Sequence, residues 1–362
     1  MPLTAELNDP CSRIRRWFDT RLPDVDALQP GWTAALAGAR TIYPRHDGVI
    51  DWSGIGTAFG YRLGYALAAF PPYHALRVLP VLTWDDAARH RVARMFQAHR
   101  DLPADCCADL RPLPDGRALL LPNPSYLATL PPPQLGASDA LVRFFARLSA
   151  ARRVWQLGSP CPPDVEEPMA RVCYALALLE AVYRRGLDTA ASWLPATAYD
   201  LTDAYLRSLA PDYVVNDLVQ LANALTSKGL PQFPVAPAIV APEFVADWAD
   251  ADLLVGDLLI DCKTTVRPRQ LHPEWIYQLL GYTLLDSADY YGIRKVGIYL
   301  SRQARLISWP VDELTAVLCD GSAPALPDLR AEFAEQIAVT LQQQDPDHWA
   351  GRWVTKSPTI SA

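Results

Sequence analysis

Lysine is scarce in this chain. It occurs only at positions 228, 263, 295 and 356, although lysine and arginine together number 33 among 362 residues. Because arginine serves almost everywhere else that a cation appears, the compact ammonium of Lys263 is a distinctive feature. The chain also lacks a basic tail, and its formal net charge is −7. Composition therefore argues against a strongly positive surface for a polyanion, although an acidic metal site needs cations only locally.

The seven cysteines form no C-x-x-C pair and no zinc-type spacing with histidine. The N-terminus shows no basic start followed by an apolar core, and the longest apolar runs are too short or too interrupted to cross a bilayer. We therefore expect reduced, mostly buried thiols, a cytoplasmic location and no membrane partner. Half of the residues are apolar, which is enough for a sizeable core.

The stretch from Ala249 to Thr264 predicts a β-hairpin. Two apolar runs flank Gly256-Asp257, and glycine tolerates the positive φ that a type II′ turn requires at its first position. If Val255 pairs with Leu258, one face is apolar, formed by Leu253, Val255, Leu258, Ile260 and Cys262. The same register places Asp252 opposite Asp261, and Asp250 opposite Lys263, on the other face.

Two carboxylates opposite each other on a sheet repel, so Asp252 and Asp261 call for a compensating charge. A divalent cation with hard oxygen ligands, Mg²⁺ or Mn²⁺, supplies one. Lys263 points into the same cluster, where the carboxylates keep it protonated and favour an electrostatic role. The alternative is a solvated strand edge, because Asp-x-Lys is common by chance.

Helices and strands are predicted on both sides of this hairpin. Residues 229–242 contain four prolines and suit a connector, and the tail after about Gln342 suits a loosely ordered segment. Helices are predicted at Arg13 to Phe18, Gly54 to Phe70 (opened by Ser53), Asp85 to Arg100, Ser138 to Leu157, Val165 to Arg185, Ala198 to Leu225 (one or two helices) and Pro273 to about Asp286. Two further strands are predicted at Lys295 to Leu300 and Arg305 to Trp309.

On the helix predicted from Pro273, Gln278 and Tyr282 lie four residues apart and share one face. Taken one by one, they are a surface glutamine and an ordinary tyrosine at the edge of the core. Together with Asp252 and Asp261-Cys262-Lys263, they resemble the PD-(D/E)XK nuclease superfamily, in its RecB-like branch. The resemblance covers about residues 240–310 and consists of an acidic residue, D-x-K and Q-x-x-x-Y in that order.

This resemblance implies a restriction-endonuclease-like fold, an α/β mixed sheet flanked by helices, and Mg²⁺-dependent cleavage of DNA. Asp252, Asp261 and the Cys262 carbonyl are then metal ligands, and Lys263 is the electrostatic catalyst. Gln278 orients Lys263 or a water, and Tyr282 supports the scissile backbone. Phosphate contacts are expected from Arg294 and Lys295, and above all from Arg267, Arg269 and Arg302.

Residues Gly56 to Gly60 look like the RecB-type first motif, but Gly60 stands where that family often has a metal-ligating histidine. Gly54-Ile55-Gly56 with Gly60 also resembles a dinucleotide fingerprint, although no strand precedes it. Only Cys319 follows the core, so no iron–sulphur cluster is expected.

Three regions are predicted: a mainly helical region 1–228 that includes helix 54–70, a nuclease core 229–315, and a C-terminal helix and tail 316–362. The expected function is metal-dependent DNA hydrolysis in bacterial repair, phage defence or mobile-element processing, with RNA as an alternative substrate. Another hypothesis is a nuclease-fold protein that binds nucleic acid, or serves as an assembly subunit, without cutting. A helical interaction protein with an incidental acidic hairpin is the third.

Overall fold

The computed structural model describes residues 2–68, 73–78, 109–112, 118–121, 163–195, 202–245, 248–319 and 324–344, with single positions 141, 143, 144, 148 and 321. The predicted helix Asp85 to Arg100, nearly all of the predicted helix Ser138 to Leu157 and the tail after residue 344 lie outside these ranges.

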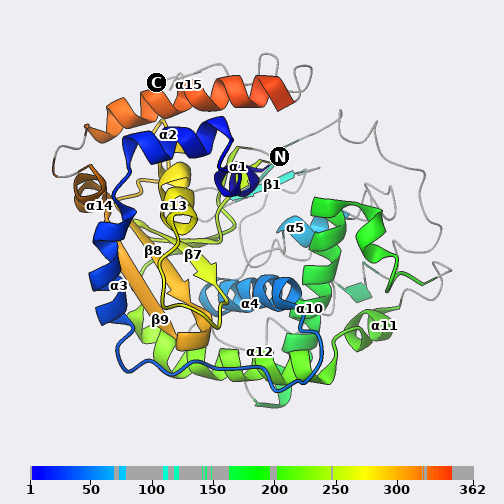
Figure 1. Ribbon diagram of the computed structural model, residues 1–362. Coiled ribbons are helices and arrows are strands. Elements are labelled where there is room, and N and C mark those ends of the chain that lie inside the picture. The colour runs from blue at the N-terminus through cyan, green and yellow to red at the C-terminus, as the bar shows by residue number, and fades with distance from the viewer. Residues whose placement is uncertain are drawn as a thin grey trace.

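The centre of the fold is a five-stranded mixed sheet with the strand order β3-β6-β7-β8-β9. Its strands are β3 (Ala238–Val240), β6 (Leu253–Val255), β7 (Leu258–Lys263), β8 (Lys295–Leu300) and β9 (Arg305–Pro310). Only β7 and β8 are parallel, so the chain must cross over between them. Helix α13 (Pro273–Leu285) makes this crossover (Figure 1).

Two short strand pairs lie apart from this sheet. One consists of β1 (Asp109–Pro112) and β2 (Ala118–Leu121), and the other of β4 (Glu243–Val245) and β5 (Ala249–Asp250). Besides short 3-10 and π turns, the other α-helices with bounds within the described residues are α1 (Leu3–Asn8), α2 (Arg13–Arg21), α3 (Gln29–Ala35), α4 (Trp52–Leu67), α5 (Tyr73–Leu76), α10 (Pro163–Arg185), α11 (Asp203–Ser208), α12 (Asp212–Ala224), α14 (Val311–Leu318) and α15 (Leu326–Gln344).

The hairpin of β6 and β7 has the predicted register, because Val255 pairs with Leu258 and Leu253 with Ile260. Gly256 has a φ of +60°, whereas Asp257 keeps a negative φ, as a type II′ turn requires. The apolar face, from Leu253 to the partly buried Cys262, packs into one hydrophobic core. The alternation of side chains along the strands therefore fixes which residues face that core.

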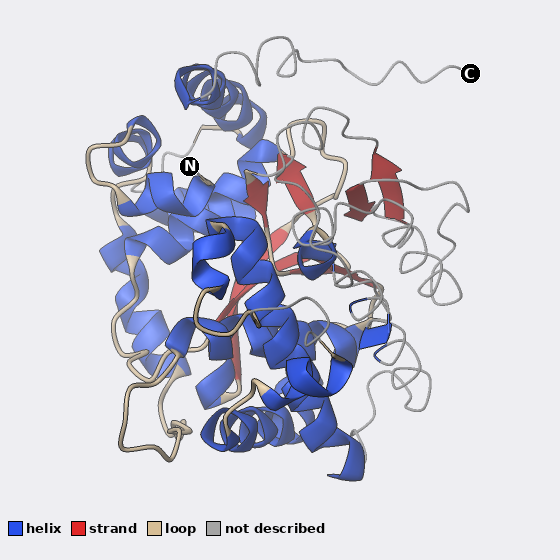
Figure 2. Ribbon diagram, turned by 90° about the vertical axis from the view of Figure 1, so that its right-hand side faces the viewer, coloured by secondary structure: helices blue, strands red, loops and turns tan. Residues whose placement is uncertain are grey.

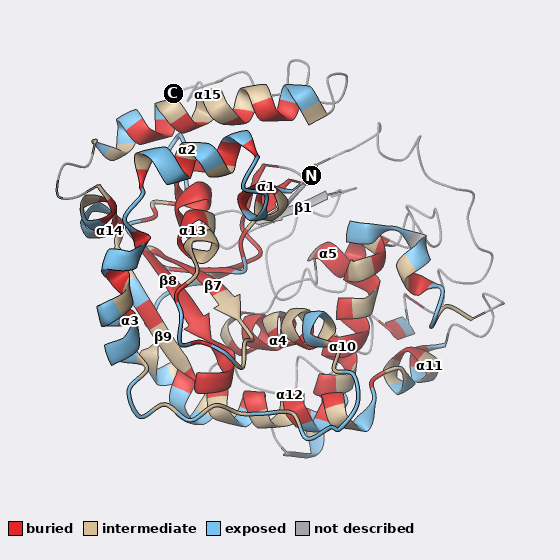
Figure 3. Cartoon of the chain, viewed as in Figure 1, coloured by how far each residue is buried: buried red, intermediate tan, exposed pale blue. Residues whose placement is uncertain are grey.

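Helices cover both faces of the sheet (Figures 1 and 2). On one face lies α13, backed by α1, α2 and α15, and it buries Ile276, Leu279 and Leu280. Pro273 suits the first turn of α13 because its fixed φ is already helical. Figure 3 shows the central strands and much of α13 buried beneath these outer helices.

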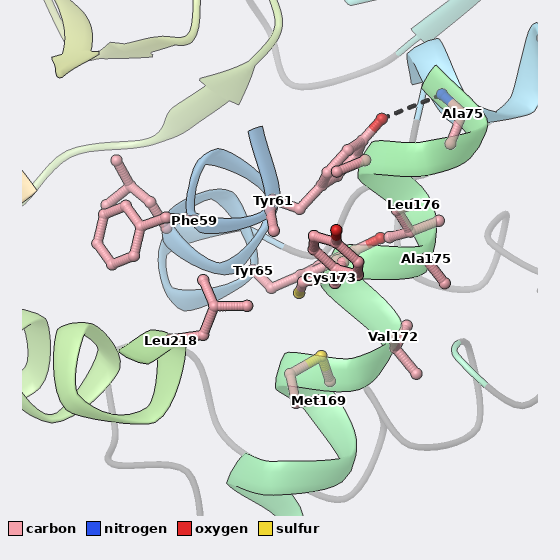
Figure 4. Packing of buried hydrophobic residues seen from close by; sticks show 14 of the residues in the cluster. Phe59, Tyr61, Tyr65, Ala75, Met169, Val172, Cys173, Ala175, Leu176 and Leu218 are labelled. Atoms are coloured by element: carbon pink, nitrogen blue, oxygen red, sulfur yellow. Dashed lines mark hydrogen bonds between the residues drawn. The ribbon is translucent and has the colours of Figure 1, made fainter. Parts of the chain in front are cut away.

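On the other face, α4 packs against α10 and α12 (Figure 4). Buried apolar side chains such as Phe59 and Leu218 fill the space between them. The buried guanidinium of Arg62 on α4 donates two hydrogen bonds, of 2.7 and 2.8 Å, to Glu166 on α10. A buried charge that is paired through two hydrogen bonds in this way fixes how the two helices are placed.

Most predicted elements are present, including the two helices within residues 198–225, but several boundaries were wrong. Helix α4 begins at Trp52 because Asp51, rather than Ser53, accepts the hydrogen bond of the Gly54 amide at 2.9 Å. Residues 229–242 are not only a connector, since β3 pairs there with β6 at the sheet edge. The coarse α/β class with a mixed sheet is confirmed, and the three predicted regions stay a prediction.

Candidate active site

The hairpin ladder ends at Leu253 and Ile260, so Asp252 lies just beyond it. The Asp252 Oδ2 atom accepts a hydrogen bond of 2.6 Å from the Cys262 amide, in place of a main-chain acceptor. This bond holds the Asp252 carboxylate beside the end of β7, the strand that carries Asp261. The predicted proximity of Asp252 and Asp261 is thereby achieved without a regular strand pair.

The predicted pairing of Asp250 with Lys263 was wrong. The chain leaves the sheet at Ala251 and Asp252, and Asp250 pairs instead with Glu243 in the separate β4–β5 ladder. Its carboxylate lies 2.8 Å from Arg184 of α10 and 3.2 Å from the His74 Nε2 atom. A continuous strand was expected from alternation alone, which cannot reveal where a strand changes its partner.

Lys263 connects the hairpin to α13. Its Nζ atom lies 2.8 Å from Asp261 Oδ2 and donates a hydrogen bond of 2.9 Å to Gln278 Oε1. The Gln278 amide then donates a bond of 3.0 Å to the hydroxyl of Tyr282. The sequence motif of four residues thus forms one continuous polar chain, with the Trp275 ring 5.9 Å from the ammonium.

Tyr282 occupies a different place from the one expected. It is only 2% exposed and stacks on Phe244, so it cannot contact a scissile backbone directly. Burial raises the pKa of Tyr282 well above its usual range, and the nearby acidic residues add to the effect. Tyr282 is therefore neutral at ordinary pH, and its contact to Gln278 positions that amide.

The two aspartates oppose each other electrostatically. Desolvation by the surrounding protein and repulsion from the neighbouring Asp261 raise the pKa of Asp252 to about 7, although part of the Asp252 residue is exposed to solvent. Asp261 is 2% exposed, and its Oδ2 atom makes no well-aligned hydrogen bond despite the nearby ammonium. One lysine does not balance two carboxylates, so this cluster has room for a further positive charge.

These groups line a cleft of about 250 Å³. Helix α4 forms its opposite wall through Gly56 and Gly60, and a Cβ atom added at Gly60 would meet nothing within 4 Å. The space beside Gly60 is therefore open in the direction where a first-motif side chain was expected. The described residues that line this cleft are Gly56, Thr57, Gly60, Tyr61, His74, Glu180, Arg184, Val240, Ala241, Asp250, Ala251, Asp252, Asp261, Cys262, Lys263 and Gln278.

His74, Glu180 and Arg184 in this wall were not found from the sequence. Arg184 lies between the carboxylates of Glu180 and Asp250, which raise its pKa although burial opposes the shift. Burial also works against the ionised form of Asp250, but Arg184 and His74 hold its pKa well below the usual range. No sequence signal marked these residues, because they come from α5 and α10 and meet β5 only in the folded chain.

The expected phosphate contacts divide into three groups. Arg267 and Arg269 are exposed on the loop between β7 and α13. Arg294 and Lys295 are exposed too, but they lie at the opposite end of the strands, where Lys295 aligns with Leu258. The prediction for Arg302 was wrong, because it is fully buried and donates two bonds, of 2.9 and 2.7 Å, to Asp217.

Among the described residues, no three histidine, cysteine, aspartate or glutamate side chains form a ready metal-binding group. Asp252 and Asp261 nevertheless fit a hard cation, because they supply oxygen ligands and carry uncompensated charge. The role of the Cys262 carbonyl stays a prediction. Burial raises the pKa of the Cys262 thiol well above its usual range, which argues against a thiolate ligand.

Comparison of the chain with family models, with curated proteins and with solved structures gives no match. The resemblance to nucleases therefore depends on the residues of the cleft. In the part of the chain that the structure describes, no helix has both the length and the apolar character needed to cross a bilayer.

Proposed function

We propose that this protein is a metal-dependent phosphodiesterase of the PD-(D/E)XK type, with a restriction-endonuclease-like core, that cleaves DNA. One observation carries the proposal. The ammonium of Lys263 links Asp261 to Gln278 and, through it, to Tyr282, at the wall of a cleft that also holds Asp252. These are the positions of the sequence motif, and they meet from strand β7, from the residue that precedes β6 and from helix α13.

Asp252 and Asp261 are the residues that would hold Mg²⁺ or Mn²⁺. A bound cation of this kind supplies Lewis acidity toward a phosphate oxygen and promotes formation of hydroxide near neutral pH. The raised pKa of Asp252 supports this assignment, because a cation relieves the repulsion that favours protonation. No other metal or cofactor is part of the proposal.

Lys263 acts through its charge. Its contacts to Asp261 and Gln278 hold the ammonium at the cleft wall, where it stabilises negative charge that develops on a phosphate. Gln278 fixes the direction of the ammonium, and Tyr282 fixes Gln278 from beneath, as a positioning residue.

A nucleic-acid-binding protein that does not cut is the second candidate. It is favoured by Gly60, which contributes no ligand and leaves open space beside the carboxylates. Binding to DNA without any products, whatever the metal, would support this candidate.

The deciding experiment is a cleavage assay of the full chain with linear, nicked and single-stranded DNA, and with RNA, in Mg²⁺, in Mn²⁺ or in a chelator. We expect degradation that requires the metal and that falls at least about 100-fold in Asp261→Ala and Lys263→Ala. Matched controls are Asp257→Ala, in the hairpin turn, and Lys295→Ala, at the far end of β8. They should retain activity.

Unchanged activity in Asp261→Ala and Lys263→Ala would identify a contaminant and overturn the assignment. Loss of activity in the two control variants as well would indicate a general loss of structure, which circular dichroism would detect.

A further inference from the structure

Two aromatic side chains are unusually exposed near the cleft. Tyr43 is 61% exposed and Trp52 is 43% exposed. Large aromatic rings are normally buried, because each covers much apolar area. Among the described phenylalanine, tyrosine and tryptophan residues, the only other one with comparable exposure is Tyr290, at 49%, which lies just before β8, at the opposite end of that strand. The position of the first two rings therefore needs an explanation.

Trp52 continues the cleft wall along α4. It lies four residues before Gly56 and eight before Gly60, so all three occupy one face of the helix. One side of its ring meets the Arg302 guanidinium, 5.2 Å away. Arg302 also donates to the Thr264 carbonyl at 3.4 Å, immediately after Lys263. Trp52 thus stands where the glycine-lined wall approaches the end of β7.

Tyr43 lies on the segment that connects α3 to α4 and runs along α12 (Figure 1). The preceding residue, Ile42, is tied to Arg302 by two bonds: its amide donates to the Arg302 carbonyl at 2.9 Å, and its carbonyl accepts from the guanidinium at 3.1 Å. Arg302 therefore contacts both the Trp52 ring and the main chain of the residue before Tyr43, and so holds both segments at the carboxyl end of β8.

Four arginines lie on the adjoining segments: Arg40 and Arg45 on either side of Tyr43 in the chain, and Arg267 and Arg269 on the loop after β7. Each is exposed, and none forms an ion pair with another described residue. The two loops that carry them are joined through Gln303, whose amide donates to Thr41 at 3.1 Å and to the Thr265 carbonyl at 3.3 Å. Asp47 and Asp51 lie on the same segment as Arg40 and Arg45, so the local excess of positive charge comes from the loop after β7, whose residues 264–272 include no acidic side chain.

We propose that Tyr43, Trp52 and these four arginines form a rim that binds single-stranded nucleic acid and directs it into the cleft. Unpaired bases stack on exposed aromatic rings, while cations contact the backbone phosphates. A duplex hides the faces of its bases and gains only the charge contacts. The missing side chains at Gly56 and Gly60 let a strand approach α4 closely. Delivery to the cleft rests on the proposed nuclease activity, whereas binding at the rim does not.

The test measures binding of the full chain to fluorescent oligothymidylate, to oligouridylate and to the duplex of the same DNA strand, by anisotropy in a chelator. Wild type should bind the single strands at least about tenfold more tightly than the duplex. Trp52→Ala and Tyr43→Ala should each weaken single-strand binding about tenfold, and Trp52→Phe should restore most of it. Duplex binding should change little.

Matched controls use Tyr290→Ala for the exposed rings and Lys295→Ala for Arg267→Ala. Both control residues are exposed at the far end of the sheet, so their variants should bind single strands as wild type does. Arg267→Ala should weaken binding and reduce its dependence on salt, because one phosphate contact is lost. Equal affinity for oligothymidylate and oligouridylate indicates recognition of stacking alone. A preference between them reflects the 2′-hydroxyl or the thymine methyl group, by which the two probes differ, and still retains the rim.

Equal affinity for duplex and single strand, or unchanged binding in Trp52→Ala and Tyr43→Ala, overturns the rim. If Asp261→Ala still abolishes cleavage in that case, the nuclease proposal stands without it. Single-strand binding that depends on Trp52, in a protein that cleaves nothing, retains the rim and overturns the nuclease. Circular dichroism of each variant separates lost contacts from lost folding.

Discussion

Two ion pairs near the carboxyl ends of β7 and β8 differ in how deeply they are buried and in how many protein partners they have. Asp217 and Arg302 are both 0% exposed and form two parallel bonds, and Arg302 also binds the carbonyls of Ile42 and Thr264. Asp261 is 3% exposed by its side chain, but Lys263 is 22% exposed and lies on the cleft wall. The first pair is saturated with protein partners, and the second keeps capacity for a ligand.

This difference distinguishes a structural pair from a candidate catalytic pair. The buried Arg302 holds three segments together, namely the segment that connects α3 to α4, helix α12 and the loop after β7. Lys263 lies beside two aspartates on the wall of a cleft, so its ammonium can stabilise negative charge on a ligand bound there. The same residue types thus serve different purposes, according to what surrounds them.

The largest effect on stability should come from the buried pair of Asp217 and Arg302. Asp217→Asn should lower the free energy of unfolding by about 3–5 kcal/mol, because it leaves Arg302 buried without a counter-charge. Asp261→Asn should change it by less than about 1 kcal/mol, since it also removes one of two repelling carboxylates. Urea denaturation of the metal-free variants measures both. Equal losses would show that the two pairs do not differ in this way.

The pH dependence of stability should isolate the cleft. The folded protein keeps a proton on Asp252 up to about pH 7, whereas the ordinary pKa is 3.8. Since the folded state binds this proton more tightly, the contribution of Asp252 to stability falls as pH rises from about 4 to 7. Melting temperatures in a chelator should show this fall in wild type and a weaker one in Asp252→Asn. An identical profile in both would exclude Asp252 as its source.

The smallest effect should come from Tyr282→Phe. It removes the acceptor of one Gln278 hydrogen bond, worth about 1 kcal/mol, and should lower kcat severalfold while KM stays unchanged. Tyr277→Phe is the matched control, because Tyr277 lies on the same helix as Tyr282 but its buried hydroxyl donates, at 3.2 Å, to the Leu22 carbonyl at the end of α2 and not to Gln278. A fall in kcat with both variants would mean that α13 itself is disturbed.

Local elements of the fold could be predicted where the pattern of residues is periodic. The β6–β7 register follows from Gly256-Asp257 and the alternation of apolar residues, and α13 follows from Pro273 and its helical spacing. The positions where helices and strands begin and end were less predictable. The choice between Asp51 and Ser53 as the cap depends on which side chain can reach the Gly54 amide, and both residue types suit that role.

The site was predictable only in its sequential half. Asp261, Lys263, Gln278 and Tyr282 lie on two consecutive elements, so their spacing already indicates that they meet. His74, Glu180 and Arg184 reach the cleft from distant segments, and only packing brings them to Asp250. The burial of Arg302 has the same origin, because its exposure depends on α12 and on the segment that connects α3 to α4, not on its neighbours in the chain.

The sequence by itself determined the hairpin, the crossover helix and the order of the acidic, lysine, glutamine and tyrosine residues, because these follow from local geometry and short spacing. Only the tertiary structure decided that Asp252 accepts a hydrogen bond from the Cys262 amide, that Asp250 pairs with Arg184 of α10, and that the buried Tyr282 hydroxyl accepts a hydrogen bond from Gln278. The tertiary structure also decided that the Arg302 side chain is buried while the Trp52 side chain stays exposed, because burial depends on how distant segments pack together.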